Sequence, residues 1–166
     1  MCIRDRVKGT SVAFLAYNCV GPAGSEAGGA RPGDAPMRVL TVYKPVSDYP
    51  GTHCHVFTFA DPDDLEALKA DIKRAKAMAD VVIVSMHWGL THLEASLSMY
   101  QQEVAHAAID GGADLLLGCH DHVIKGIEVY GGRVIFYGLG NFAVDNPIKA
   151  KPVGRHMAGA AGALGG

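Results

Sequence analysis

Two histidines separated by one residue, His120 and His122, are the side chains in this sequence best suited to binding a metal ion. They follow the apolar run at residues 114–117 and a glycine, a pattern typical of a buried strand that ends in a loop. If the segment stays extended, residues two apart point the same way, so both imidazoles can face one point. Converging neutral imidazoles bind borderline metals such as Zn, Mn or Fe.

A second apolar run, at residues 80–86, also ends in a histidine, His87. Two strand ends that each deliver a histidine to a loop predict an α/β active site at the carboxyl edge of a sheet. The alternative is that these histidines are exposed or hydrogen-bonded without a metal. His53 and His55 form another pair, but no strand end singles them out, so they are weaker metal candidates and a partly exposed strand explains them better.

Composition narrows the class of protein. The chain has 166 residues, 49% hydrophobic and 19% charged, which predicts one globular domain with a core. A net charge of −2 argues against a nucleic-acid partner. We find neither a signal peptide nor an apolar run of the ~20 residues that span a bilayer, which leaves a cytoplasmic or an envelope-associated location open. The four scattered cysteines predict free thiols. Cys119 could be a soft metal ligand, but a small buried hydrophobic residue is the better interpretation.

The periodicity predicts strands that alternate with helices. One helix should begin at Asp61, with Pro62 in its first position, and a second should span 94–109 with Leu97 on its inner face. A Gly- and Pro-rich loop at 18–36 suggests mobility or a lid. Two successive strand–helix–strand steps predict an α/β fold with parallel strand pairs. The expected strands are residues 10–17, 37–43, 53–59, 80–86, 114–117, 124–130 and 133–137.

Three motifs occur in order: HWG, then DGGADLLLGCHDHV after an amphipathic helix, then IEVYGGRVIFYGLGNF. Over residues 12–145 the chain resembles the bacterial capsule-synthesis CapA (PGA_cap) family, which is similar in fold to the calcineurin-like metallophosphoesterases. The resemblance implies a sandwich of mixed sheets flanked by helices, with a two-metal site. His87 would take the place of the single histidine ligand, His120 and His122 those of the paired histidines, and Asn141 that of the GNF motif that closes the site.

The sequence also departs from that family. An early Asp, a GD segment with a bridging carboxylate and an Asn-His element are not found, so the chain resembles the C-terminal half of an N-terminally truncated domain. Asp121 stands where the family more often has proline; it could orient an imidazole or solvate the loop. We assign residues 7–148 to this partial domain, 1–6 to a non-native or disordered tail and 149–166 to a disordered tail.

The resemblance implies a metal-dependent hydrolase of the phosphoesterase type, using Mn, Fe or Zn to activate water in capsule, poly-γ-glutamate or cell-envelope polymer metabolism. Its substrate would be a phosphoester or poly-γ-glutamate, and the fragment alone is expected to be inactive. The alternative is a non-catalytic capsule-assembly or binding protein that keeps the fold. His92 and Glu94 could donate protons or contact substrate, or could be structural, and Trp88 could line the pocket or belong to the core.

Overall fold

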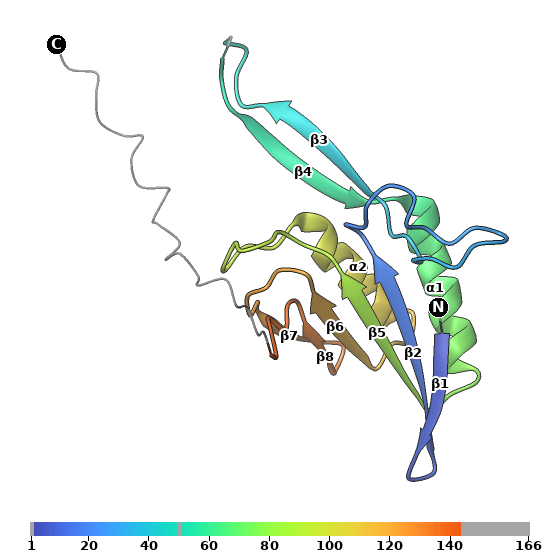
Figure 1. Cartoon of the computed structure of the whole chain (residues 1–166). Coiled ribbons are helices and arrows are strands. Elements are labelled where there is room, and N and C mark those ends of the chain that lie inside the picture. The colour runs from blue at the N-terminus through green and yellow to red at the C-terminus, as the bar shows by residue number, and fades with distance from the viewer. Residues whose placement is uncertain (1, 50, 144–166) are drawn as a thin grey trace.

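A six-stranded mixed sheet organises the computed structural model, which describes residues 2–49 and 51–143 (Figure 1). The predicted tail at 149–166 and the predicted domain end at 148 lie outside the described residues. The mixed α/β architecture confirms the predicted fold class. In spatial order the strands are β1 (Cys2–Val7), β2 (Thr10–Asn18), β5 (Val81–His87), β6 (Leu115–Cys119), β8 (Arg133–Phe136) and β7 (Ile127–Tyr130).

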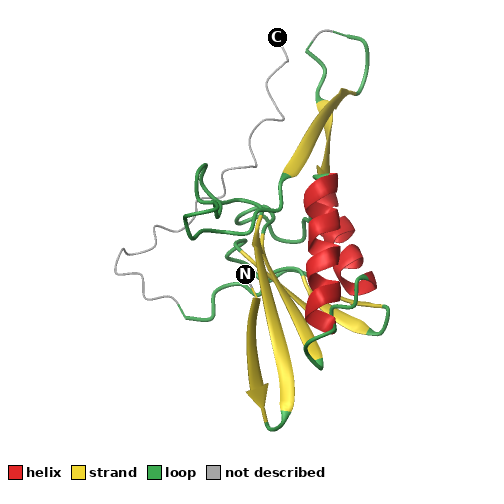
Figure 2. Cartoon of the chain, turned by 90° about the vertical axis from the view of Figure 1, so that its right-hand side faces the viewer, coloured by secondary structure: helices red, strands yellow, loops and turns green. Residues whose placement is uncertain are grey.

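The four central strands, β2, β5, β6 and β8, run parallel, as the strand–helix–strand pattern predicts. Every second residue of β5 is buried, because one face of the sheet packs against α1 (Pro62–Lys76) and α2 (Met99–Asp110). Both helices lie on this same face (Figure 2). Among the described residues, no helix is long and apolar enough to cross a membrane.

Both helices begin at a recognisable capping residue. The Asp61 side chain accepts hydrogen bonds from Asp63 N and Asp64 N, and the helix begins at Pro62, as predicted. The second helix begins at Met99, after a capping box between Ser98 and Gln101. The predicted start at residue 94 was therefore wrong, and Leu97, expected on the inner face, is exposed in the preceding loop.

Strand β1 replaces the tail expected at residues 1–6. Cys2–Val7 pairs antiparallel with β2 in continuous register, and Val7 faces Thr10 across a tight turn. Lys8 and Gly9 both have positive φ in that turn, which is the geometry of a two-residue hairpin. The expectation of a disordered tail therefore does not hold for residues 2–6, whose order comes from pairing with β2.

The segment between β2 and α1 forms a folded loop and a projecting ribbon. In the 18–36 loop, Asp34 N donates to Ser25 O, and Asn18 Nδ2 donates to Asp34 Oδ2, at 2.9 and 2.8 Å. The ribbon consists of β3 (Val39–Pro45) and β4 (Cys54–Ala60), and it extends away from the sheet (Figure 1). These strands lie one or two residues later than predicted.

Asp114 fixes the start of β6 against its neighbours. Its carboxylate accepts from Val82 N at 2.8 Å and pairs with Lys76 at 2.6 Å and with Arg133 at 3.0 Å. Burial raises the pKa of Asp114, but the hydrogen bonds and charges of these partners outweigh it, so the pKa lies below its ordinary value. The ionised carboxylate therefore ties α1, β5 and β8 to β6 and holds the strand register on which the site depends.

Candidate functional site

Strand register brings three polar side chains side by side at the carboxyl edge of the sheet. His87, the last residue of β5, pairs with Asn18 of β2 on one side and with Cys119 of β6 on the other. Residues directly opposite each other in a sheet project from the same face. The two strand ends that were expected to meet therefore do lie at one edge, and the histidine loop at 120–126 continues from it.

His120 lies at the centre of the histidine cluster. Its Nδ1 is 2.8 Å from His87 Nε2, and its Nε2 is 2.8 Å from the Thr91 hydroxyl. Burial lowers the pKa of His120, and the neighbouring His87 lowers it further. A neutral imidazole is the form that binds a metal ion, so this environment favours a ligand role for His120.

His122 is held separately, on the other side of the loop. The Asn141 side-chain oxygen can only accept a hydrogen bond, so His122 Nδ1 donates to it, at 2.8 Å. This leaves His122 Nε2 as the nitrogen with a free lone pair. The His92 ring stacks on His122 with centroids 5.5 Å apart, whereas the centroids of His120 and His122 are 6.5 Å apart.

The backbone of the histidine loop is not extended. For His120 and His122 to point the same way, as the sequence suggested, the backbone would have to be extended, and this condition is not met. His120 and His122 both adopt positive φ, at 100° and 58°. Left-handed backbone is uncommon for non-glycine residues and persists only where surrounding contacts impose it. The two imidazoles are therefore placed by the turn of the loop and by Thr91 and Asn141.

Trp88 belongs to the core beneath the site. Its side chain is fully buried, its indole N–H donates to Tyr137 O at 3.0 Å, and its ring stacks on Tyr137. Gly118 makes this packing possible, because a Cβ at that position would lie 2.2 Å from Tyr137 O and 2.5 Å from Trp88 Nε1. Of the two interpretations of Trp88, the structure supports the core aromatic.

Asp121 is buried and makes no hydrogen bond to either imidazole of the loop. Its carboxylate is 1% exposed, and neither oxygen has a hydrogen-bond partner within the described part of the chain. The nearby Gln101 Nε2 is likewise buried and unpartnered. Burial raises the pKa of Asp121, with the charge of Lys125 acting in the opposite direction. Asp121 therefore does not orient a histidine through a direct hydrogen bond.

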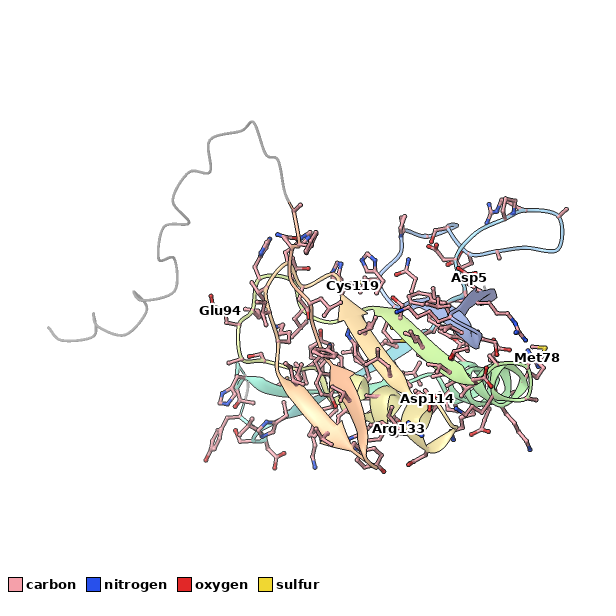
Figure 3. All side chains as sticks on the ribbon, turned by 90° about the horizontal axis from the view of Figure 1, so that it is seen from below. Asp5, Met78, Glu94, Asp114, Cys119 and Arg133 are labelled. Carbon is pink, nitrogen blue, oxygen red and sulfur yellow. The ribbon has the colours of Figure 1, made fainter. Side chains whose placement is uncertain are left out.

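Of the other candidate residues, one contacts the histidine cluster and the rest lie apart from it or are poor ligands. His92 touches the site through His122, whereas Glu94 is exposed at the outer edge of the molecule, well apart from Cys119 (Figure 3). Burial raises the pKa of the Cys119 thiol, which keeps it protonated and disfavours a thiolate ligand. His53 and His55 lie just before and within exposed β4, away from the carboxyl edge.

The three histidines lie at one edge of the sheet, and their spacing can be compared with that of metal ligands. Two imidazole nitrogens bound to one ion lie about 3.4 Å apart in tetrahedral geometry and about 3.0 Å apart as neighbours in octahedral geometry, given metal–nitrogen distances of about 2.1 Å. The 2.8 Å between His87 Nε2 and His120 Nδ1 is the length of a hydrogen bond, and an ion bound by both nitrogens would lie off the line that joins them. Across residues 2–49 and 51–143, however, no three His, Cys, Asp or Glu side chains converge as a complete metal site would.

Sequence reasoning missed several residues of the site. A cavity of about 280 Å³ lies beside His87 and is lined also by Asn18 and Asp34. Asp34 is a carboxylate brought there by the folding of the 18–36 loop, and Thr91 reaches His120 from the 88–98 loop. Neither residue stands in a recognisable motif. Both reach the site only because loops that are distant in sequence meet in the fold, so no signal in the sequence identified them.

Comparison with known proteins gives matches of one kind. The model of the bacterial capsule synthesis protein PGA_cap family matches residues 2–146. The chain is 45% identical to the PGA biosynthesis protein CapA of Bacillus subtilis (strain 168) over 84 residues, 51% of this chain and 22% of the relative. It is 32% identical to the capsule biosynthesis protein CapA of Bacillus anthracis over 143 residues, 86% of this chain and 29% of the relative. A probable polyglutamine synthesis accessory protein of Mycobacterium tuberculosis is 34% identical over 59% of this chain and 25% of its own length. The chain thus spans less than a third of these relatives.

Proposed function

Because this chain belongs to the bacterial capsule synthesis protein PGA_cap family, we propose that its complete protein is a metal-dependent hydrolase that acts in capsule or poly-γ-glutamate metabolism. The names of the CapA relatives support a part in capsule and poly-γ-glutamate synthesis. Hydrolysis is the further step of the proposal. It rests on the chemistry of the histidine cluster, with a phosphoester or poly-γ-glutamate as the substrate.

The gathering of His87, His120 and His122 at one edge of the sheet supports the proposal. With Mn, Fe or Zn bound there, the ion would polarise a phosphoryl or acyl oxygen and lower the pKa of bound water to about 7. If His120 binds through Nδ1, its Nε2–H donates to the Thr91 hydroxyl, which fixes the tautomer and the ring. Asn141 does the same for His122, whose Nε2 stays available as a third ligand.

The second candidate is a non-catalytic capsule-assembly or binding protein that keeps the fold. One observation favours it: among the described residues, no carboxylate joins the three histidines as a bridging ligand. Asp34 lines the neighbouring cavity but hydrogen-bonds Asn18. If additional ligands belong to another part of the protein, the chain alone is expected to bind metal but to hydrolyse substrates poorly.

A hydrolysis assay separates the two functions. The protein, expressed with any coding sequence that adjoins this chain, is loaded with Mn²⁺ and given bis(p-nitrophenyl) phosphate and poly-γ-glutamate. We expect metal-dependent cleavage of one substrate, and a loss of about a hundredfold or more in His87→Ala/His120→Ala, because both proposed ligands are removed. Metal binding without cleavage would favour the non-catalytic function. Cleavage equal in the variant and the parent would contradict the histidine site.

A further inference from the structure

Lys125 joins the histidine loop to the 88–98 loop that covers it. Its side chain is only 5% exposed, and its ammonium group donates to Leu93 O and, at 3.0 Å, to Ser96 O. A buried ammonium group is costly unless such hydrogen bonds compensate it. Among the described residues, two hydrogen bonds tie residues 93–96 to the rest of the chain, and Lys125 donates both of them.

Within the 88–98 loop, residues 91–97 have few other contacts that hold their shape. Residues 91–97 are all exposed, so no apolar burial anchors them. His92 and Ala95 adopt positive φ, at 59° and 45°, a backbone conformation that non-glycine residues take only when contacts impose it. The conformation of this loop must therefore depend on a few polar contacts at its inner side.

This loop contacts two histidines of the cluster, His120 and His122. Thr91 lies 2.8 Å from His120 Nε2, and the His92 ring stacks on His122. The His92 backbone N–H also donates to Asp121 O at 2.9 Å. Any displacement of the loop would consequently move the groups that orient both imidazoles.

The fold leaves a specific space for the lysine. A Cβ on Gly138 would lie 2.6 Å from Lys125 Cγ and 3.0 Å from Asp121 Oδ2, so glycine at this position lets both buried side chains pass. The lysine stem therefore packs against Gly138, which lies just after β8, and its ammonium group is directed to the 88–98 loop.

We infer that Lys125 is a positioning residue of the histidine site, whose buried ammonium group fixes the 88–98 loop and so sets the places of Thr91 and His92. Its effect on metal binding rests on the proposed function. The anchoring of the loop does not, because the hydrogen bonds to Leu93 O and Ser96 O involve no metal ligand.

The test replaces Lys125 by methionine, which keeps the apolar stem and removes the charge and the donors. We expect backbone amide hydrogen exchange in residues 89–97 to become at least about tenfold faster, while the sheet exchanges as before. Mn²⁺ affinity, measured by calorimetry, should fall about tenfold, as for the loss of a group that orients a ligand. The matched control is Lys69→Met, because within the described part of the chain Lys69 pairs with Glu66 alone, on the surface of α1.

The outcomes are separable. Unchanged exchange in residues 89–97, or a uniform increase over the whole chain, would overturn the inference, as would faster loop exchange with unaltered metal affinity. If the parent protein binds no Mn²⁺, the proposed function fails, and loop exchange alone decides the anchoring. Should Lys125→Met not fold, nitrogen-15 NMR of the parent protein decides: slow proton exchange at Lys125 Nζ supports a buried, bonded ammonium group, and exchange as fast as at Lys69 overturns it.

Discussion

Replacing His120 with alanine is expected to lower the affinity of the protein for Mn²⁺ or Zn²⁺ by about a hundredfold or more, the largest loss for a single histidine. His120 is the side chain that connects the cluster, since one ring nitrogen meets His87 and the other meets Thr91. Its removal deletes one ligand and leaves His87 without the partner that orients it. Isothermal titration calorimetry of the two proteins measures the change directly.

The matched control for this experiment is His55→Ala. His55 is an exposed histidine of β4, away from the carboxyl edge of the sheet, so its removal should leave the affinity unchanged. Equal losses in the two variants would indicate nonspecific binding to surface histidines. Unaltered affinity in His120→Ala would exclude His120 as a ligand.

Gly118→Ala is expected to destabilise the fold by about 3 kcal/mol, at the upper end of what overpacking costs. The added methyl group would lie 2.2 Å from the carbonyl oxygen of Tyr137 and 2.5 Å from Trp88 Nε1. Both are fixed, because the Trp88 indole donates to that same carbonyl. Relief of the clash requires β6 to separate from the segment after β8, which would also displace the histidine loop.

Urea denaturation, followed by circular dichroism, measures this destabilisation as a lower midpoint. Gly126→Ala is the control, because a Cβ there meets no atom within 4 Å and Gly126 does not have positive φ. It should unfold near the parent midpoint. A Gly118→Ala variant as stable as Gly126→Ala would mean that the close packing around Trp88 is wrong.

Local patterns in the sequence predicted most of the sheet and the first helix. The apolar run at residues 80–86 identified β5, and Asp61 with Pro62 marked the start of α1, because these signals arise within a single element. The strand Cys2–Val7 was missed because its charged sequence shows no strand periodicity, and its order depends on pairing with β2. The sequence pattern also predicted helix at residues 94–98, but the capping box at Ser98 places the start of α2 at Met99.

The candidate site was predictable at the level of strand ends but not of side-chain geometry. Apolar runs that end in His87 and in the histidine loop placed both at one edge, as the register between β5 and β6 shows. The positive φ of His120, the contact from Thr91 and the burial of Lys125 could not be foreseen, because each depends on loops that meet only in the folded chain. A lysine in particular is normally expected at the surface.

The claim that His87, His120 and His122 form a metal centre is tested most directly by elemental analysis of protein purified without chelator. We predict near-stoichiometric Mn, Fe or Zn in the parent protein and its loss in a folded His87→Ala/His120→Ala/His122→Ala variant, with His53→Ala/His55→Ala retaining the metal. Equal and negligible metal in the parent and the triple variant, both folded, would contradict the metal centre and leave the three histidines as hydrogen-bonded residues at the edge of the sheet.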